Sequence, residues 1–418
     1  MINIKPFKAL RPKKELYSSI VSLPYDVLTD DECREITLKN PLSFLNIIRS
    51  EVNFNKDIDP YSDVVYEKAK SNLDMFIKKG YLIQDEKPYL YVYRLKKDNI
   101  SQIGFISAVS ANDYDKGLIK KHEETRIDKV NDRIKHIDTV NAHTGFVFLT
   151  YRSKEELNKI LDDIQKTDVE VDFTTDDNVT HTLWVIRDDK LINKIVEEFK
   201  KISCLYIADG HHRSVAASSI AKKRQGNNKE NIKERESNYF LSIIFPHNCL
   251  NILSYNRAIK DLNGMSIEEF LKKIENNFII KKESPNYDND GFKPDSTKKI
   301  GMYLDGQWYL LIPKNNIIEQ DPVSSLDVSI LQKYIIDPIL NIRDLRKDKR
   351  IDFIGGIRGT SFLKKIVDSG EYKVSFSIYP TSIEQLMEVA DAGELMPPKS
   401  TWFEPKPRSG LAIHLLDE

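Results

Sequence analysis

The chain has 418 residues, of which 40% are hydrophobic and 30% are charged, and its 63 Lys and Arg residues nearly balance its 64 Asp and Glu residues. This balance lacks the overall positive charge expected of a dedicated nucleic-acid binder or of a protein that binds membrane surfaces, although a local basic pocket is compatible with it. At roughly 150 residues per domain, the length indicates two or three domains with cores that need no disulfide support.

The cysteine content excludes two further classes of protein. Only Cys33, Cys204 and Cys249 occur, without the CxxC spacing of a thiolate zinc site or of a disulfide framework. No window approaches the ~20 apolar residues of a membrane-spanning helix. We therefore expect a cytoplasmic protein with no membrane partner.

The first 80 residues are predicted to be largely helical. Ser19–Leu23 resembles a short strand that ends in the turn Pro24-Tyr25-Asp26. A helix is expected to begin after Thr29, whose hydroxyl can cap it, and to end at Asn40-Pro41. Apolar residues at helical spacing predict a second helix over Tyr61–Gly80, with the glycine at its C-terminal end.

Strands and helices alternate in the rest of the chain. The predicted strands are Tyr89–Leu95, Ile103–Val109, Gly145–Thr150, His181–Ile186, Leu205–Ala208, Tyr239–Phe245, Ile252–Ile259, a hairpin over Met302–Ile312 with Asp305-Gly306 at its turn, and Leu411–Leu415. The predicted helices are Glu155–Ile164, Leu191–Ile202 and Ile267–Phe278. Polar residues predict a surface loop over Lys222–Ser237 and a second polar stretch over Lys281–Lys299.

This order predicts an α+β fold of mixed sheets with flanking helices. We place the boundary between an N-terminal region, 1–262, and a C-terminal region, 263–418. The alternative is that the C-terminal strands return to the first region.

The sharpest motif is Asp209-Gly210-His211-His212-Arg213, which follows a buried strand and precedes a helix of small residues. Backbone N–H groups at the start of a helix bind anions, and the two histidines and the arginine would add donors. Asp209 could accept a proton from an incoming hydroxyl group. In the alternative interpretation, Asp209 only caps the helix and one histidine is packed in the core.

A second cluster runs from Lys121 to Arg133. If it is helical, one face presents cations and a hydroxyl group to a phosphorylated ligand, namely His122, Thr125, Lys129, Asp132 and Arg133. A solvated helix with ion pairs is the equal alternative. Glu123 and Glu124 could help to hold a divalent ion, although their spacing does not decide this.

A third candidate is Met396-Pro397-Pro398-Lys399-Ser400-Thr401, in which two prolines stiffen the approach to three donors. It could equally be a proline-rich connector. The isolated cations Arg49, Arg257 and Arg358 are interpreted as members of surface salt bridges.

Several of these segments resemble successive blocks of a large bacterial family known only as a domain of unknown function, and the resemblance runs nearly end to end. The blocks are Ser22-Leu23-Pro24-Tyr25-Asp26-Val27, Asn40-Pro41-Leu42-Ser43-Phe44-Leu45, the His122-to-Arg133 cluster, Ala208-Asp209-Gly210-His211-His212-Arg213, Tyr255-Asn256-Arg257, and Met396-Pro397-Pro398-Lys399-Ser400-Thr401. Members of this family are similar to diphosphate-dependent serine kinases, which transfer phosphate from pyrophosphate to L-serine.

The block from Asp209 to Arg213 also resembles the phosphate-binding motif of the ParB and sulfiredoxin-like superfamily, which includes free-serine kinases with a nucleotide donor. In compact ParB-like domains the early proline lies closer to this motif, whereas more than a hundred residues separate Pro24 from Asp209 here. The resemblance thus implies a ParB-like phosphate-binding core with large insertions.

The resemblance implies a kinase that forms O-phospho-L-serine from L-serine and pyrophosphate, with ATP or ADP as the alternative donors and magnesium as the counter-ion. The absence of GxxxxGK[ST] and GxGxxG motifs is compatible with a compact donor. In this hypothesis Asp209 is the base, Glu123 is a second candidate for base or metal ligand, and His211 is a further catalytic candidate that binds the donor. The remaining phosphate ligands are expected to be His122, Thr125, Lys129, Arg133, Gly210, His212, Arg213, Lys399, Ser400 and Thr401.

Two other hypotheses stay open. One is a ParB-like regulator that binds a nucleotide or nucleic acid, which the neutral charge and the lack of a helix-turn-helix pattern disfavour. The other is a phosphate-ester or nucleotide hydrolase, in which water replaces the serine hydroxyl group. The sequence does not specify the metal ligands or the oligomeric state.

Overall fold

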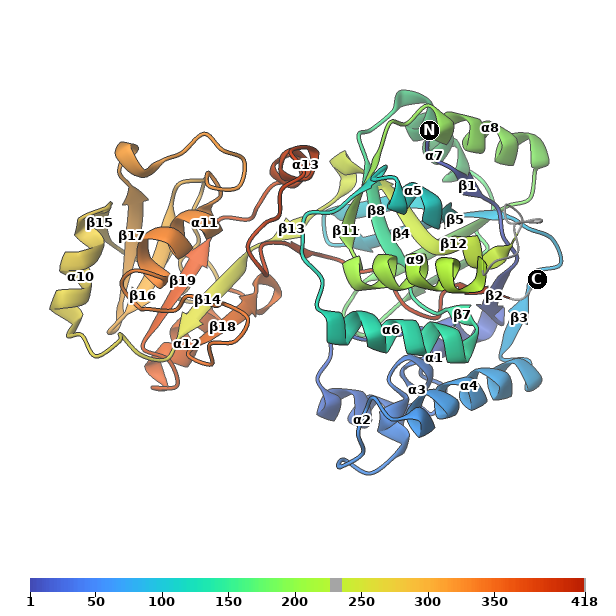
Figure 1. The fold of residues 1–418 in the computed structure, drawn as a ribbon, viewed down its shortest axis with the longest axis horizontal. Helices are drawn as coiled ribbons and strands as arrows, with labels where there is room; N and C mark the ends of the chain where they lie inside the picture. The colour runs from blue at the N-terminus through green and yellow to red at the C-terminus, as the bar shows by residue number, and fades with distance from the viewer. Residues whose placement is uncertain (226–234, 417–418) are drawn as a thin grey trace. The chain divides into compact units, whose positions relative to one another are not determined.

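The computed structural model describes residues 1–225 and 235–416, which form two compact units (Figure 1). The first comprises Met1–Lys121, Thr125–Leu250 and Pro405–Glu418, and the second comprises His122–Glu124 and Asn251–Glu404. Units defined by compactness need not coincide with domains, so the predicted regions 1–262 and 263–418 stay a prediction.

The first unit is built on a nine-stranded sheet in the order β6-β11-β8-β12-β5-β4-β10-β9, with β1 paired to β5. Its strands are β1 (Ile4–Lys5), β4 (Leu90–Lys97), β5 (Ile100–Ser110), β6 (Ile119–Lys120), β8 (Val147–Tyr151), β9 (Val171–Thr174), β10 (Thr180–Ile186), β11 (Leu205–Asp209) and β12 (Tyr239–Pro246). The sheet is mixed, because β11 runs antiparallel to β8 and parallel to β6. The predicted α+β fold of mixed sheets is confirmed.

A smaller sheet joins the two ends of the chain within this unit. Its order is β3-β2-β21-β7, and its strands are β2 (Ala9–Pro12), β3 (Leu82–Gln84), β7 (Ala142–His143) and β21 (Ile413–Leu415). The last strand lies between β2 and β7 and pairs antiparallel with both. The C-terminal strand therefore returns to the first unit, as the alternative interpretation of the sequence expected.

Amphipathic helices cover these sheets. The helices of the first unit are α1 (Tyr17–Ile20), α2 (Asp30–Lys39), α3 (Leu45–Ile48), α4 (Asp63–Lys78), α5 (Ala111–Asp115), α6 (Ile127–Val140), α7 (Glu155–Ile164), α8 (Asp189–Lys200) and α9 (His211–Gln225). Leu157 of α7 and Phe199 of α8 share the main hydrophobic core with Phe105 of β5. Helices α6 and α9 lie side by side (Figure 1), joined through Ile137, Ala216 and Ile220.

The second unit has its own six-stranded sheet, in the order β15-β17-β16-β19-β14-β18, and a two-stranded sheet of β13 and β20. Its strands are β13 (Ile252–Leu253), β14 (Tyr255–Ile259), β15 (Phe278–Glu283), β16 (Ile300–Leu304), β17 (Gln307–Pro313), β18 (Ile351–Gly355), β19 (Val374–Ile378) and β20 (Trp402–Phe403). Its helices are α10 (Ile267–Glu275), α11 (Asp327–Leu331), α12 (Ser361–Asp368) and α13 (Ile383–Asp391). The predicted hairpin is confirmed, because Asp305 and Gly306 both have positive φ angles, of 50° and 77°.

Three local predictions are wrong. The predicted single strand Ile252–Ile259 is two strands, β13 and β14, which belong to different sheets. Residues Tyr17–Ile20 form α1 rather than the start of a strand, because Tyr17 and Ile20 lie one turn apart and are both buried. The predicted loop Lys222–Ser237 begins too early, since α9 continues to Gln225, and its residues 226–234 lie outside the described residues. Within residues 1–225 and 235–416, no helix has the length and apolar character needed to cross a membrane.

Candidate functional site

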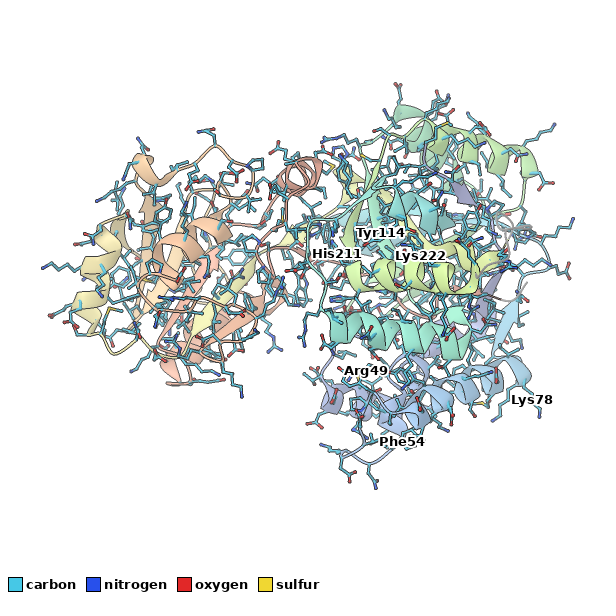
Figure 2. The ribbon with its side chains drawn as sticks, in the orientation of Figure 1. Arg49, Phe54, Lys78, Tyr114, His211 and Lys222 are labelled. Atoms are coloured by element: carbon cyan, nitrogen blue, oxygen red, sulfur yellow. The ribbon has the colours of Figure 1, made fainter. Side chains whose placement is uncertain are left out.

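The predicted strand, turn and helix around Asp209 are confirmed. Strand β11 is buried up to Ala208, and Gly210 turns the chain at a φ of +95°, which L side chains rarely adopt. Helix α9 begins at His211 (Figure 2), and the Ser214 N–H group donates to the Gly210 carbonyl at 3.0 Å. The N–H groups of the preceding first turn have no acceptor within the helix, so their dipoles favour an anion at this end.

Asp209 is held as a carboxylate at this turn. Its Oδ2 atom lies 2.8 Å from Lys406 Nζ, its Oδ1 atom accepts from the Gly210 N–H group at 2.7 Å, and Arg213 Nη2 lies 3.9 Å away. Burial alone would raise the pKa of Asp209, but the charges of Lys406 and Arg213 outweigh it and hold that pKa well below its usual range. Asp209 is therefore ionised at neutral pH and carries a negative charge beside two cations.

The two histidines of the motif have different surroundings. His211 is 5% exposed, so one histidine is packed, as the alternative interpretation expected. The Nε2 atom of His212 accepts a hydrogen bond from the Arg126 N–H group at 3.1 Å, which requires that nitrogen to be unprotonated.

The turn that follows Pro24 lies beside this motif. The Val27 N–H group donates to the Pro24 carbonyl, which confirms the predicted turn, and Arg49 fixes it by donating to the Tyr25 and Leu28 carbonyls at 2.8 and 3.1 Å. Arg49 also pairs with Glu51, but its side chain is only 13% exposed, so it is not a surface cation. Tyr25 interacts electrostatically with the guanidinium groups of both Arg133 and Arg213, and Asp26 with Lys406.

The cluster from Lys121 to Arg133 is only partly helical. Helix α6 begins at Ile127, so His122 and Thr125 precede it and the predicted common helical face is wrong. Lys129 donates to the Tyr61 hydroxyl group at 2.9 Å. Arg133 is buried, pairs with Asp132 at 2.7 Å, and stacks over the Tyr25 ring at 4.1 Å.

A cavity of about 30 Å³ lies within the first unit, between this buried arginine and the motif. Its polar lining consists of Tyr25, Arg133, His136, His143, Thr144, Arg213 and Ser409. Its apolar lining includes Ile48, Ile137, Val147 and Leu241. Two guanidinium groups thus border one cavity.

His136 makes the stability of this unit depend on pH. Its ring is 3% exposed, and burial, together with the charge of Arg133, lowers its pKa from 6.5 to about 4. Between these values the unfolded chain binds a proton that the folded chain does not, so the free energy of unfolding should fall by about 3 kcal/mol as the pH drops from 6.5 to 4.

The variant His136→Gln keeps a donor for the Ile47 carbonyl, which His136 Nε2 contacts at 3.1 Å, but does not titrate. We expect it to reduce the slope of stability against pH by up to ~1.4 kcal/mol per pH unit, measured by urea unfolding between pH 4.5 and 7. An unchanged slope would contradict the assignment.

The second unit brings other predicted residues together. The Met396 N–H group donates to the His122 carbonyl at 2.8 Å, and Thr401 Oγ1 lies 3.4 Å from His122 Nε2. Lys399 has a φ of 59°, and its ammonium group lies 5.7 Å from the Tyr255 ring centroid. The Ser400 hydroxyl group donates to the Pro397 carbonyl at 2.6 Å, so its proton is already used and it offers a ligand only lone pairs. Glu123 belongs to this unit as well.

The prediction that Arg257 forms a surface salt bridge is wrong. It is 2% exposed rather than at the surface, and its guanidinium group donates to the carbonyls of Tyr255 and Pro398 and stacks on Phe353. No carboxylate among the described residues pairs with it, and burial lowers its pKa to about 9. The expected surface contact of Arg358 is compatible with its exposure.

Sequence reasoning missed Lys406, Arg408 and Ser409. Lys406 holds Asp209, Arg408 pairs with Asp177, and Ser409 lines the cavity. The one available signal was the alternation of prolines and cations in Pro405-Lys406-Pro407-Arg408, which indicates a stiff segment with ordered charges.

Comparisons with solved structures find weak similarities over most of the chain. A free serine kinase in complex with AMP is 10% identical, with 74% of this chain and 89% of that chain covered at a TM-score of 0.34. SbnI from Staphylococcus aureus, with a C-terminal truncation, is 10% identical, with 74% and 87% covered at a TM-score of 0.38. A conserved hypothetical protein from Pyrococcus furiosus is 12% identical, with 71% and 90% covered at a TM-score of 0.33.

No curated protein matches the chain. A family model described as "Protein of unknown function (DUF1015)" matches residues 4–329, which is most of the chain. The chain therefore belongs to this family of proteins of unknown function.

Proposed function

We propose that the protein is a phosphotransferase that moves a phosphoryl group from pyrophosphate to the hydroxyl group of free L-serine, which gives O-phospho-L-serine. The observation that carries this proposal is the ionised Asp209 carboxylate at the start of α9, held by Lys406 and close to Arg213. A negative acceptor for a proton and positive donors for phosphate oxygens lie next to each other there.

In this reaction Asp209 would accept the proton of the attacking hydroxyl group. The serine oxygen would form a bond to phosphorus while the bond to the leaving phosphate breaks, and the proton would pass to the carboxylate. A low pKa does not prevent this, because in a loose transition state the hydroxyl proton is transferred late, when the attacking oxygen has become strongly acidic.

The donor would bind at the end of the helix. The N–H groups of His211 and His212 and the guanidinium group of Arg213 would neutralise the charge of the transferring phosphoryl group. Gly210 would contribute through the turn that it makes, because its own N–H group donates to Asp209. Thr125, Lys129, His122, Lys399 and Thr401 stay proposed phosphate ligands, and Glu123 stays a second candidate for base or metal ligand. Ser400 could bind phosphate only if its hydroxyl proton left the Pro397 carbonyl. His211 is 5% exposed, so its backbone rather than its ring suits a donor contact.

Magnesium is part of the proposal. It prefers oxygen ligands and usually reaches such sites on phosphate oxygens, with one or two carboxylates. Asp26 fits this role, because it is exposed and makes no hydrogen bond or ion pair with another described residue. Asp209 fits it less well, since Lys406 occupies one of its oxygens. The ion would supply charge neutralisation of the donor.

The test is product detection after incubation of the purified protein with L-serine, magnesium and either pyrophosphate or ATP, with donor-free controls. Phosphoserine formed with pyrophosphate alone supports the proposal. Phosphoserine formed with ATP alone supports a serine kinase but contradicts pyrophosphate as its donor. Release of phosphate without phosphoserine indicates a hydrolase, and no reaction together with nucleotide or DNA binding in low salt indicates a regulator.

A further inference from the structure

The cavity beside Arg213 has an unusual set of polar groups. Four of them make no hydrogen bond with any other described residue: Arg133 Nη1, the Tyr25 and Thr144 hydroxyl groups and the Ser409 hydroxyl group. His143 also borders the cavity, and its Nε2 atom is buried without a partner. Of these five atoms, only His143 Nε2 is fully buried, and a buried polar atom normally has a partner. The other four atoms are not fully buried and are available to a ligand in the cavity.

The groups around this space are donors more than acceptors. Arg133 offers two N–H bonds at Nη1, and three hydroxyl groups can each donate one more. Tyr25, whose ring stacks on Arg133, also interacts with the charge of Arg213. Such a set matches an anion with several lone pairs.

The charged groups that line the cavity itself are the two guanidinium groups of Arg133 and Arg213, which favour an anion there. Over the wider region the charges balance, because the cations Arg133, Arg213 and Lys406 are opposed by the carboxylates Asp132, Asp209 and Asp26. Both cavity histidines stay neutral at pH 7, because burial lowers the pKa of His136 and of His143 below that pH. A singly charged carboxylate would therefore add less uncompensated negative charge than a phosphate dianion.

The size of the cavity agrees with a carboxylate. An oxygen-sized centre needs roughly 10–15 Å³, so about 30 Å³ accommodates the two oxygens of one carboxylate. Ile137, Val147 and Leu241 give the cavity an apolar wall, which suits the carbon atom next to such a group.

We infer that this cavity binds the carboxylate of the acceptor amino acid, with Arg133 as the principal ligand and Thr144, Ser409 and Tyr25 as hydroxyl donors. The inference rests on the proposed function. In serine only two carbon atoms separate the carboxylate from the hydroxyl oxygen, and one guanidinium group, that of Arg213, borders the cavity and lies 3.9 Å from Asp209. A carboxylate in the cavity would thus leave the hydroxyl group close to the proposed base. It would also select a free amino acid over a serine in a peptide chain.

The test is direct binding, measured by calorimetry or NMR titration on the full chain. We expect L-serine to bind the wild type, and 2-aminoethanol, which lacks the carboxylate, to bind at least 100-fold more weakly. Arg133→Gln should weaken L-serine binding at least 30-fold. Because this variant leaves Asp132 unpaired and could lose its fold, Thr144→Val provides a nearly isosteric second test, with an expected 3- to 10-fold loss.

Lys135→Gln is the matched control, since Lys135 lies on the same helix, is 41% exposed and pairs with Asp63. It should change L-serine affinity by less than twofold. The inference is overturned if the wild type does not bind L-serine, if 2-aminoethanol binds equally well, or if both cavity variants bind as the wild type does. Loss of inorganic phosphate binding in Arg133→Gln, with L-serine binding retained, would assign the cavity to the donor instead.

Binding and turnover separate this inference from the proposed function. If L-serine binding depends on Arg133 but no phosphoserine forms with any donor, the kinase proposal fails and the carboxylate site stands. If phosphoserine forms, the cavity variants should raise the KM for L-serine and leave the KM for the donor unchanged. Unchanged KM values for L-serine in both variants would contradict the proposed carboxylate site and leave the kinase proposal standing.

Discussion

Replacement of Asp209 by asparagine is expected to lower kcat for phosphoserine formation by two to four orders of magnitude, the usual contribution of a proton acceptor in catalysis. Asparagine has the same shape and can still accept from the Gly210 N–H group, which Asp209 Oδ1 contacts at 2.7 Å. It cannot take the hydroxyl proton. Affinity for the donor should change little, because Asp209 is not among the proposed phosphate ligands. Steady-state kinetics with both substrates varied would measure this.

The substitution also removes the carboxylate that pairs with Lys406, so a structural cause has to be separated from a catalytic one. The double variant Asp209→Asn/Lys406→Met removes both charges of this pair. If the carboxylate is the base, this variant stays inactive although its stability recovers. Recovery of activity would assign Asp209 a structural role. Asp128→Asn, which breaks the exposed pair with Arg126 on α6, is the control and should retain activity within twofold.

Substitution of Gly104 by alanine is expected to destabilise the first unit by about 3 kcal/mol, at the upper end of the usual cost of overpacking. Gly104 lies in β5, and a Cβ atom there would lie 2.5 Å from the Ile244 carbonyl oxygen and 2.8 Å from Phe245 Cδ1. The carbonyl belongs to β12, which pairs with β5, so it cannot move away without loss of strand pairing. Urea unfolding followed by hydrogen exchange in peptides of the first unit would report the change.

Ser101→Ala is the control on the same strand. Ser101 is exposed, and an exposed substitution of this kind usually changes stability by less than 0.5 kcal/mol. If both variants unfold at the same urea concentration as the wild type, the strand tolerates a side chain at position 104. The close approach of β12 would then not be the reason for a glycine there.

Local sequence patterns predicted many elements of this fold, because interactions between residues close in the sequence determine those elements. Thr29 and Glu32 form the reciprocal capping bonds of α2, and the residues of α7 were predicted without error, since their apolar spacing coincides with the buried side of a helix. The turn at Asp209-Gly210 was predictable for the same reason, because a glycine that follows a buried strand permits the positive φ that the turn requires.

Tertiary contacts explain what the sequence could not predict. Nothing near Asp209 in the sequence indicates that its counter-ion is Lys406, since a separation of 197 residues carries no periodic signal. Arg257 can be buried because its guanidinium group donates to backbone carbonyls and stacks on the Phe353 ring. These contacts cannot be predicted from the sequence, and most arginines lie at the surface. Helix α6 begins at Ile127 although the charged run starts earlier, because charge patterns do not mark a helix start when no capping residue precedes it.

The return of the C-terminal segment to the first unit has a consequence for biosynthesis. A chain emerging from the ribosome places strands β2 and β7 early, but the strand that joins them, β21, follows the whole of Asn251–Glu404. Lys406 and Ser409 arrive with it. The nascent first unit therefore carries Asp209 without its lysine until the segment after Glu404 has been made, and a chain that stops before this segment would lack two side chains of the site.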